Sequence, residues 1–238
     1  FCVRNSDFTW DVSKAMQPAR LKSGLDPKKY YNILHVPNAL YPEQIKFENE
    51  KDLEKNSLVF MGTLGKENGP DLAIQAMSNV KKRFPDARLH IIGGGREEEL
   101  SSLAIKNKVE KNVVFHGFIS DRTEVSKATR KYMIGLAPYI NKKGSARLYG
   151  DATKIRAYTA AGLPVITTSV PPLGREIVEA SAGVIVKDDS EALSDAIIKI
   201  LSNPVLYKTL RNGAIKFAKE NTWENVFDKA FLEMHSNE

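Results

Sequence analysis

The feature of this sequence that most constrains its fold is a regular alternation, beginning near Ser57, of short apolar runs with longer amphipathic runs. The apolar runs have the length of β-strands, and the amphipathic runs have the length of α-helices. Such alternation is typical of βαβ units, in which helices join parallel strands and cover the sheet. We therefore expect an α/β fold with a doubly wound parallel sheet of about six strands, at residues 58–61, 88–92, 113–115, 133–137, 165–168 and 184–186.

Helices are expected between these strands and after the last one. The clearest helix, residues 70–84, has a proline in its first turn and Pro85 just beyond its end. A short helix at 12–22 is expected before the alternation begins. The remaining helices are expected at residues 97–106, 152–161, 173–180 and 191–201, and two more at 204–219 and 223–234 follow the last strand.

Cysteine content and hydropathy exclude several classes of protein. Cys2 is the single cysteine, so the chain has no internal disulfide and no cysteine-based zinc cage, and a reducing compartment is favoured. The longest uncharged apolar run, residues 132–140, is far shorter than the roughly 20 residues of a membrane helix. The chain starts at Phe1 without a basic-then-apolar leader, which indicates a piece of a longer protein.

Two glycine-rich loops follow the first two expected strands. The first, GTLGKENG at 62–69, leads into a helix and is able to cradle an anion. It matches neither the Walker spacing nor the Gly-x-Gly-x-x-Gly fingerprint, which argues against ATP hydrolysis and NAD binding. The second, residues 93–95, precedes Glu97, Glu98 and Glu99, which would repel a phosphate, so a structural turn is favoured there.

A basic loop after the fourth expected strand is the strongest candidate site. Five basic residues against one acidic residue give it a local excess of four positive charges: Lys142, Lys143, Arg147, Lys154 and Arg156 against Asp151. The loop leads into a helix start, where free amides and the helix dipole favour an anion. The alternative is a merely solvated basic face. The coincidence of charge, helix start and strand end favours a phosphate site that uses Arg147 and Lys154.

Other chemistries find little support in the sequence. The four histidines, His35, His90, His116 and His235, have no metal-ligand spacing, so no metal site is expected. A Gly-x-Ser-x-Gly elbow is absent, which argues against a serine hydrolase. Tyrosines near the basic loop are better explained by packing than by stacking on bases, so no nucleic-acid partner is expected.

Several segments, taken together, resemble the nucleotide-sugar-binding half of the GT-B glycosyltransferases, in particular the retaining family 4, also called group 1. The order and spacing of the matching segments hold from about residue 35 to 234. The most specific segment is KIRAYTAAGLPVI at 154–166. The others are HVPNA at 35–39, VFMGTL at 59–64, NGPDLAIQA at 68–76, ARLHIIGGG at 87–95, VVFHGFI at 113–119 and TWE at 222–224.

The resemblance implies a Rossmann-like C-terminal half of a GT-B fold that binds a nucleoside-diphosphate sugar without a further cofactor. Residues 1–35 would be the tail of an N-terminal acceptor domain and the interdomain segment, and residues 36–238 the donor-binding domain. The implied enzyme transfers a sugar, with retention, to a glycan or a lipid-linked acceptor. A cytoplasmic location is implied, with peripheral association at a membrane as an open alternative.

The resemblance also implies roles for individual residues. Arg147 and Lys154 would stabilise the departing diphosphate and are the expected catalytic residues. The base would lie near the third loop, and the phosphates on the first glycine loop and the basic helix start. The expected nucleotide-sugar contacts are Gly62, Thr63, Leu64, Lys66, Gly94, Gly117, Phe118, Ile119, Asp151, Thr153 and Ala157.

The chain also departs from the family pattern. Thr63 and Asn68 stand where the family usually has a phosphate-binding arginine and lysine, for which Lys66 is a candidate substitute. The family's Glu-x7-Glu pair falls on Tyr149 and Ala157. These departures keep open a divergent, non-catalytic member that binds a nucleotide or a partner. A GT-B-fold sugar-nucleotide epimerase or phosphorylase is a second alternative, because it would use the same donor-binding domain.

Overall fold

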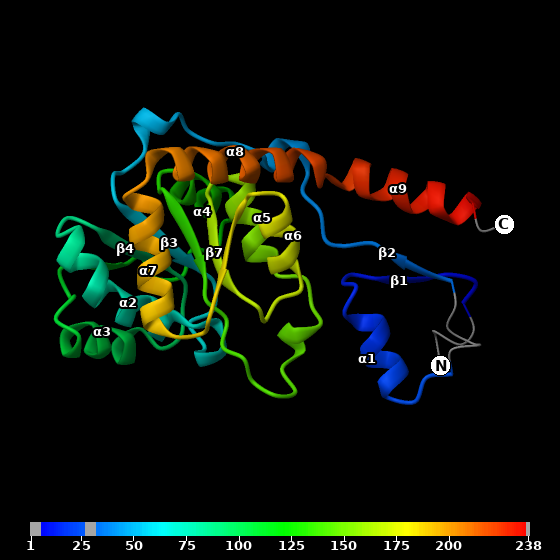
Figure 1. The fold of residues 1–238 in the computed structure, drawn as a ribbon, viewed down its shortest axis with the longest axis horizontal. Coiled ribbons are helices and arrows are strands. Elements are labelled where there is room, and N and C mark those ends of the chain that lie inside the picture. The colour runs from blue at the N-terminus through cyan, green and yellow to red at the C-terminus, as the bar shows by residue number, and fades with distance from the viewer. Residues whose placement is uncertain (1–5, 27–31, 237–238) are drawn as a thin grey trace.

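The computed structural model describes residues 6–26 and 32–236, and Cys2 lies outside this part of the chain. Its centre is a six-stranded parallel sheet in the order β5-β4-β3-β6-β7-β8, with helices on both faces (Figure 1). In this order the first strand of the sheet, β3, lies at the middle, as in dinucleotide-binding folds. The expected doubly wound α/β fold is confirmed.

The six strands lie within one residue of their expected bounds. All neighbouring pairs run parallel. The strands are nearly continuous apolar runs because helices bury both faces of the sheet. Their bounds are Ser57–Met61 for β3, Arg88–Ile92 for β4, Val113–Phe115 for β5, Ile134–Ala137 for β6, Val165–Thr168 for β7 and Gly183–Val186 for β8.

Alternate residues of β3 point to opposite faces of the sheet and join different cores. Leu58 and Phe60 pack in one core with apolar residues of α2, α3 and α7. Val59 and Met61 pack in the other core with residues of α5, α6 and α8. The helices of the first layer are α2 Pro70–Arg83, α3 Glu97–Lys106 and α7 Ser190–Leu201; those of the second are α5 Thr153–Ala160, α6 Leu173–Glu179 and α8 Pro204–Glu220.

The helix α4, Arg122–Thr129, was not expected from the sequence. It is short and mostly polar, and Thr129 is its only buried residue. Its start is set by Asp121, whose carboxylate accepts a hydrogen bond from the Thr123 amide at 2.7 Å. Short 3-10 helices are also present, at Pro42–Gln44, Glu50–Asp52, Lys66–Asn68 and Ala146–Leu148.

The N-terminal segment forms a small sheet of its own, apart from the central sheet (Figure 1). Strand β1, Thr9–Asp11, pairs in parallel with β2, Ile33–His35. Helix α1 follows at Met16–Lys22, so the expected helix start at residue 12 was wrong. The last helix α9, Trp223–Ser236, packs on this sheet through Val226 and Ala230, so contacts cross the expected boundary at residue 35.

The strands β3 and β6 separate toward their carboxyl ends. They pair only at Leu58 with Ile134 and Val59 with Gly135, although β3 remains paired with β4 as far as Met61. The buried hydroxyl of Tyr158 fills the gap: it accepts a hydrogen bond from the Met61 amide at 2.8 Å and donates one to Leu136 O at 3.1 Å. This gap is the topological switch point, where folds of this type bind their ligands.

Candidate functional site

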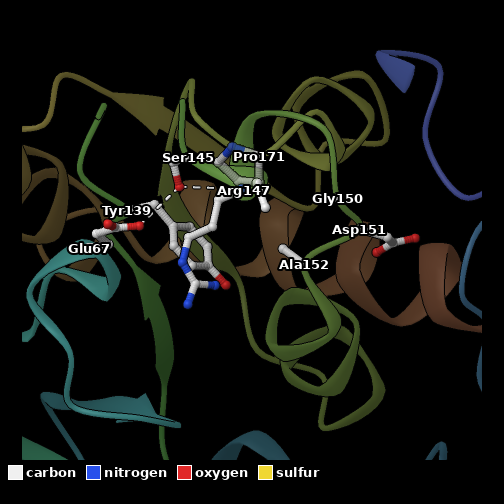
Figure 2. Close-up of a pocket in the computed structure, with 9 residues that line it drawn as sticks. Glu67, Tyr139, Ser145, Arg147, Gly150, Asp151, Ala152 and Pro171 are labelled. Atoms are coloured by element: carbon white, nitrogen blue, oxygen red, sulfur yellow. Dashed lines mark hydrogen bonds between the residues drawn. The ribbon is translucent and has the colours of Figure 1, made fainter. Parts of the chain in front are cut away.

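The loops at the carboxyl ends of β3, β6 and β7 enclose a pocket of about 350 Å³. Glu67 comes from the loop after β3, and Pro171 follows β7. Figure 2 shows Glu67, Tyr139, Ser145 and Arg147 gathered on one side of this pocket. Its other lining residues are Ala146, Gly150, Asp151, Ala152 and Pro171, so it includes most of the basic loop singled out in the sequence.

Lys154 carries a buried amine beside the switch point. Its Nζ has no hydrogen-bond partner in the described part of the chain. The amine lies 4.1 Å from the ring centre of Phe60 and 4.9 Å from that of Tyr139. Burial, and then the charge of Arg147, lower the pKa of Lys154 to about 7. The two cation–π contacts replace only part of the lost hydration, so this amine is poised to gain an anionic partner.

Arg147 faces the same aromatic ring as Lys154. Its guanidinium carbon lies 5.3 Å from the ring centre of Tyr139. The 3-10 helix that carries it, Ala146–Leu148, is capped by Ser145, whose hydroxyl accepts a hydrogen bond from the Arg147 amide at 3.4 Å. Burial raises the pKa of the Tyr139 hydroxyl to about 12. The structure thus brings together the two cations that the sequence selected.

The first glycine loop approaches Lys154 closely. Gly62 has a φ of 114°, and a Cβ on it would lie 3.8 Å from Lys154 Nζ. Helix α5 starts one residue before Lys154, and no side chain caps its start at Ala152. Gly150 and Ala152, just before the helix, line the pocket. The glycine turn at Gly62, the uncapped start of α5 and the Lys154 amine are therefore neighbours, although Gly62 and Lys154 do not themselves line the pocket.

Thr63 and Asn68, which stand where the family usually has its phosphate-binding pair, form a hydrogen bond within the first loop. The Asn68 amide, which is buried, donates a hydrogen bond to Thr63 O at 2.6 Å. Leu64 is fully buried, and its amide donates to Gly94 O at 3.1 Å. The Thr63 side chain is exposed. The predicted contacts of these residues with a nucleotide sugar stay predictions.

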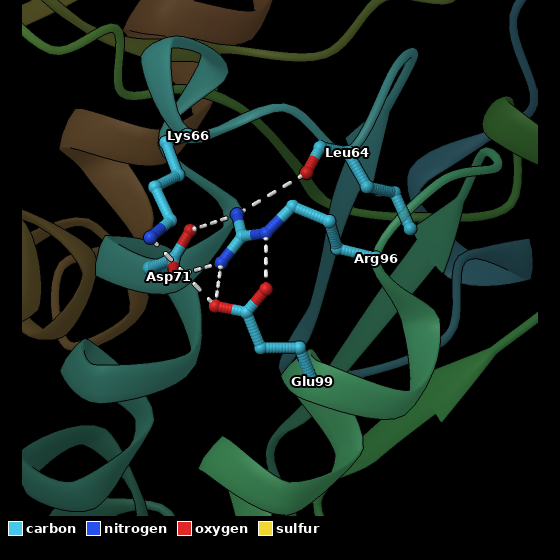
Figure 3. Close-up of polar contacts among 5 residues, drawn as sticks. All are labelled: Leu64, Lys66, Asp71, Arg96 and Glu99. Carbon is cyan, nitrogen blue, oxygen red and sulfur yellow. Dashed lines mark hydrogen bonds and ion pairs between the residues drawn. The ribbon is translucent and has the colours of Figure 1, made fainter.

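Arg96 is a further cation next to the first glycine loop, and it donates a hydrogen bond to Leu64 O (Figure 3). It makes five hydrogen bonds, one from each of its N–H groups, to Asp71, Glu99 and Leu64 O. These contacts, first those with Glu99 and then those with Asp71, raise the pKa of Arg96. Lys66 joins this cluster with its Nζ 3.9 Å from Glu99, and it does not line the pocket.

The second and third loops lie against the first. The Gly93 amide donates a hydrogen bond to Gly117 O at 2.8 Å, and a Cβ on Gly94 would lie 3.3 Å from Phe118 Cβ. Phe118 is 77% exposed, whereas Ile119 packs against the second core. The predicted base-binding residues are thus neighbours at one edge of the sheet. Their contact with a base stays a prediction.

Asp151 is held by partners within the chain. Its carboxylate forms an ion pair of 2.7 Å with Arg156, in which both side chains are buried. It also accepts a hydrogen bond from the Asn38 amide at 3.0 Å, which connects the segment after β2 to the basic loop. Of the other predicted contacts on α5, Thr153 is exposed and Ala157 packs against the second core.

Two features of this region were missed in the sequence. Tyr158 lies one turn after Lys154 on α5, and that spacing was the available signal for it. A histidine pair was also missed: His90 Nδ1 lies 3.0 Å from His116 Nε2, and Glu54 lies 3.0 Å from His90 Nε2. Burial, and then His90, lower the pKa of His116. His90 lies in β4, and His116 directly follows the neighbouring strand β5, at the start of the third loop.

Two structural searches of the described residues gave negative results. Within residues 6–26 and 32–236, no three histidine, cysteine or carboxylate side chains are grouped so as to hold a metal ion. Over the same ranges, every helix is too short or too polar to cross a membrane. The predicted independence from metals and the predicted location stay predictions.

Comparison with known families gives a match over most of the chain. The family model "Glycosyl transferases group 1" matches residues 42–220. The lipopolysaccharide glucosyltransferase WaaG of Escherichia coli is 26% identical over 213 residues, which are 88% of this chain and 54% of that protein. The phosphatidyl-myo-inositol mannosyltransferase of Mycobacterium leprae is 26% identical over 172 residues, 71% of this chain and 44% of that protein.

Comparison with solved structures agrees on the fold. The crystal structure of HepE from Anabaena in complex with UDP superposes with a TM-score of 0.77 at 15% identity, over 97% of this chain and 64% of that one. At this identity the likeness shows the fold alone. The chain spans about half the length of the curated relatives it matches.

Proposed function

The chain belongs to the group 1 glycosyl transferases, and from this premise we propose that it is the donor-binding part of an enzyme that transfers a sugar from a nucleoside-diphosphate sugar. The acceptor would be a hydroxyl group of a glycan or a lipid-linked glycan. Retention of the anomeric configuration is part of the proposal and rests on the family resemblance. The observation that carries the proposal is the buried amine of Lys154, which lacks a hydrogen-bond partner among the described residues.

A diphosphate at the switch point would supply the partner that Lys154 lacks. A buried amine without a hydrogen bond destabilises a fold. Its position beside Gly62 and the start of α5 therefore supports the proposal that an anionic ligand binds there. Arg147 shares the ring of Tyr139 with Lys154 and is the second cation for the phosphates. The bound UDP of the HepE structure supports the choice of a nucleoside diphosphate.

The chemistry proposed for these residues is stabilisation of the leaving group. When the bond from the sugar to the diphosphate breaks, negative charge grows on the phosphate oxygen that leaves. Lys154, Arg147 and the amides at the start of α5 would stabilise that charge from fixed positions. The pocket would also hold the anomeric carbon in line with the acceptor hydroxyl.

The proposed domain organisation follows the same premise. Residues 36–238 would form the donor-binding domain, and residues 1–35 would belong to the acceptor domain and the connection to it. The separate β1–β2 sheet supports this division, although α9 packs on that sheet. A cytoplasmic enzyme that meets a lipid-linked acceptor at the membrane surface is the corresponding proposal for location.

A second candidate function is a non-catalytic nucleotide-binding subunit. It is favoured by Tyr149 and Ala157, which occupy the positions of the family's acidic pair. Tyr149 is 42% exposed, and Ala157 offers no polar atom on its side chain. If this candidate is right, sugar nucleotides bind but are neither transferred nor hydrolysed, and Ala157→Glu produces no activity.

Calorimetric titration of the 238-residue chain with UDP, GDP and ADP tests the proposed function. We expect one of them to bind with a Kd near 1 μM, which corresponds to about −8 kcal/mol. Lys154→Met should weaken this binding by about 10- to 100-fold, because a charge-assisted hydrogen bond is lost. The matched control is Lys199→Met on α7, an exposed lysine in the other helical layer, which should leave the Kd unchanged. Failure of the folded chain to bind any of the three would refute the proposal.

A further inference from the structure

Two carboxylates line the pocket: that of Asp151, which is paired with Arg156, and that of Glu67, although Tyr149 and Ala157 occupy the positions of the family's acidic pair. Glu67 lies in the 3-10 helix Lys66–Asn68, between the first glycine loop and α2. It thus reaches the pocket from the chain after β3, whereas Arg147 reaches it from the chain after β6. The acidic residue Glu67 and the basic residue Arg147 therefore line the pocket from two different segments of the chain.

Backbone contacts fix the position of Glu67. The Ile140 amide donates a hydrogen bond to Glu67 O at 3.1 Å. Two residues later, Gly69 has a φ of 75°, and a Cβ on it would lie 1.8 Å from Pro138 O. These contacts join the 3-10 helix to the chain that leaves β6. The Glu67 side chain is thus presented to the pocket by two tightly packed segments.

The Glu67 carboxylate is ionised and only partly occupied. It accepts hydrogen bonds from Lys142 Nζ at 2.9 Å and from Ser145 Oγ at 3.0 Å. These two contacts, in that order, lower the pKa of Glu67. A carboxylate has about four lone-pair positions, so roughly two remain available for further donors. Glu67 is 37% exposed on the side chain, and the pocket gives a ligand access to it.

We propose that Glu67 is a specificity-determining residue whose carboxylate accepts hydrogen bonds from hydroxyl groups of the donor sugar. This rests on the proposed function, which places the diphosphate beside Lys154 and Arg147. Sugars present hydroxyl donors, and the pocket offers the carboxylate of Glu67 as an acceptor for them. Arg147 lines the same pocket, so the sugar and the phosphates would lie next to each other.

A purely structural role for Glu67 predicts a different result. Its contacts with Lys142 and Ser145 connect two loops, and loss of that connection would disturb the diphosphate and the sugar alike. A direct contact with the sugar affects only ligands that carry one. The ratio of the two affinities therefore separates the roles.

The experiment measures Kd values for matched pairs of ligands: UDP with UDP-glucose, GDP with GDP-mannose, and ADP with ADP-glucose. Each pair is titrated into the 238-residue chain, Glu67→Gln and the control Glu98→Gln, an exposed glutamate on α3. Glutamine keeps the size of Glu67 and one acceptor oxygen for Ser145. We expect Glu67→Gln to weaken the sugar nucleotide by about tenfold relative to its diphosphate, and Glu98→Gln to change neither.

Lys142→Met is the second variant, because it removes the exposed partner of Glu67 and leaves the carboxylate in place. If Glu67 contacts the sugar, this variant keeps the wild-type ratio of affinities. An unchanged ratio in Glu67→Gln overturns the inference, and so does an equal drop for both ligands, while the proposed function survives either result. A chain that binds no diphosphate overturns both proposals.

Discussion

Two cations lie next to the first glycine loop, and their surroundings differ sharply. Arg96 uses all five of its N–H groups within the chain, two of them on the carboxylate of Asp71 (Figure 3). Lys154 reaches the loop at Gly62 with an amine that has no hydrogen-bond partner in the described residues. All the N–H donors of Arg96 have partners within the chain, whereas the amine of Lys154 has none among the described residues.

The difference distinguishes a charge that the fold stabilises from a charge that it opposes. Contacts within the chain raise the pKa of Arg96, whereas burial lowers that of Lys154 to about 7. The fold thus stabilises the charge of Arg96 and opposes the charge of Lys154. Because a shifted pKa is a statement about stability, removal of the two side chains should have opposite effects.

Arg96→Met should give the largest change in the free energy of unfolding. It leaves Asp71 and Glu99 without their shared cation and places two like charges near each other. Both carboxylates are partly exposed, so we expect a loss of about 2 kcal/mol, less than for a fully buried pair. Urea denaturation measures this loss. A stability equal to the wild type would mean that the cluster is a surface feature without structural importance.

Lys154→Met should change stability in the opposite direction by a smaller amount. The buried amine is replaced by an apolar side chain of similar length, so we expect a gain of about 1 kcal/mol and a Tm higher by about 2–4 °C at pH 7. The free amine has a pKa near 7, below that of an unfolded lysine. The penalty is therefore full below pH 7 and fades as the pH rises toward about 10.

Thermal scans of both proteins between pH 6 and 10 test this dependence. The Tm difference between Lys154→Met and the wild type should shrink across the range, while Lys199→Met follows the wild type throughout. A methionine variant that is less stable than the wild type at every pH would show that Lys154 supports the fold as Arg96 does.

Local patterns were sufficient to predict the central sheet. Most residues of the strands are apolar, because helices cover both faces of the sheet. The helix α4 escaped prediction because its eight residues include few apolar ones, and its start depends on one carboxylate, that of Asp121. The strands β1 and β2 precede the alternation of apolar and amphipathic runs, which is the pattern that revealed the equally short β5.

The candidate site was predictable in its cations but not in their surroundings. Arg147 and Lys154 stand out as basic residues next to a helix start, which is a property of adjacent positions. The pairing of Arg96 with Asp71 joins residues 25 positions apart, and that of Tyr158 with Met61 joins residues 97 apart. Such contacts depend on how β3, β4 and α5 pack. Lys66 illustrates the limit, because its position beside the glycine loop did not reveal that it turns toward Glu99.

The measurement that tests the central claim most directly is the number of protons taken up when the diphosphate binds at pH 8.5. Titrations in buffers with different ionisation enthalpies give this number. A free amine with a pKa near 7 is mostly neutral at pH 8.5, and a bound phosphate restores its charge. We expect an uptake close to one proton in the wild type and in Lys199→Met, and close to zero in Lys154→Met. Binding without proton uptake in the wild type would contradict the assignment of Lys154 to the phosphates.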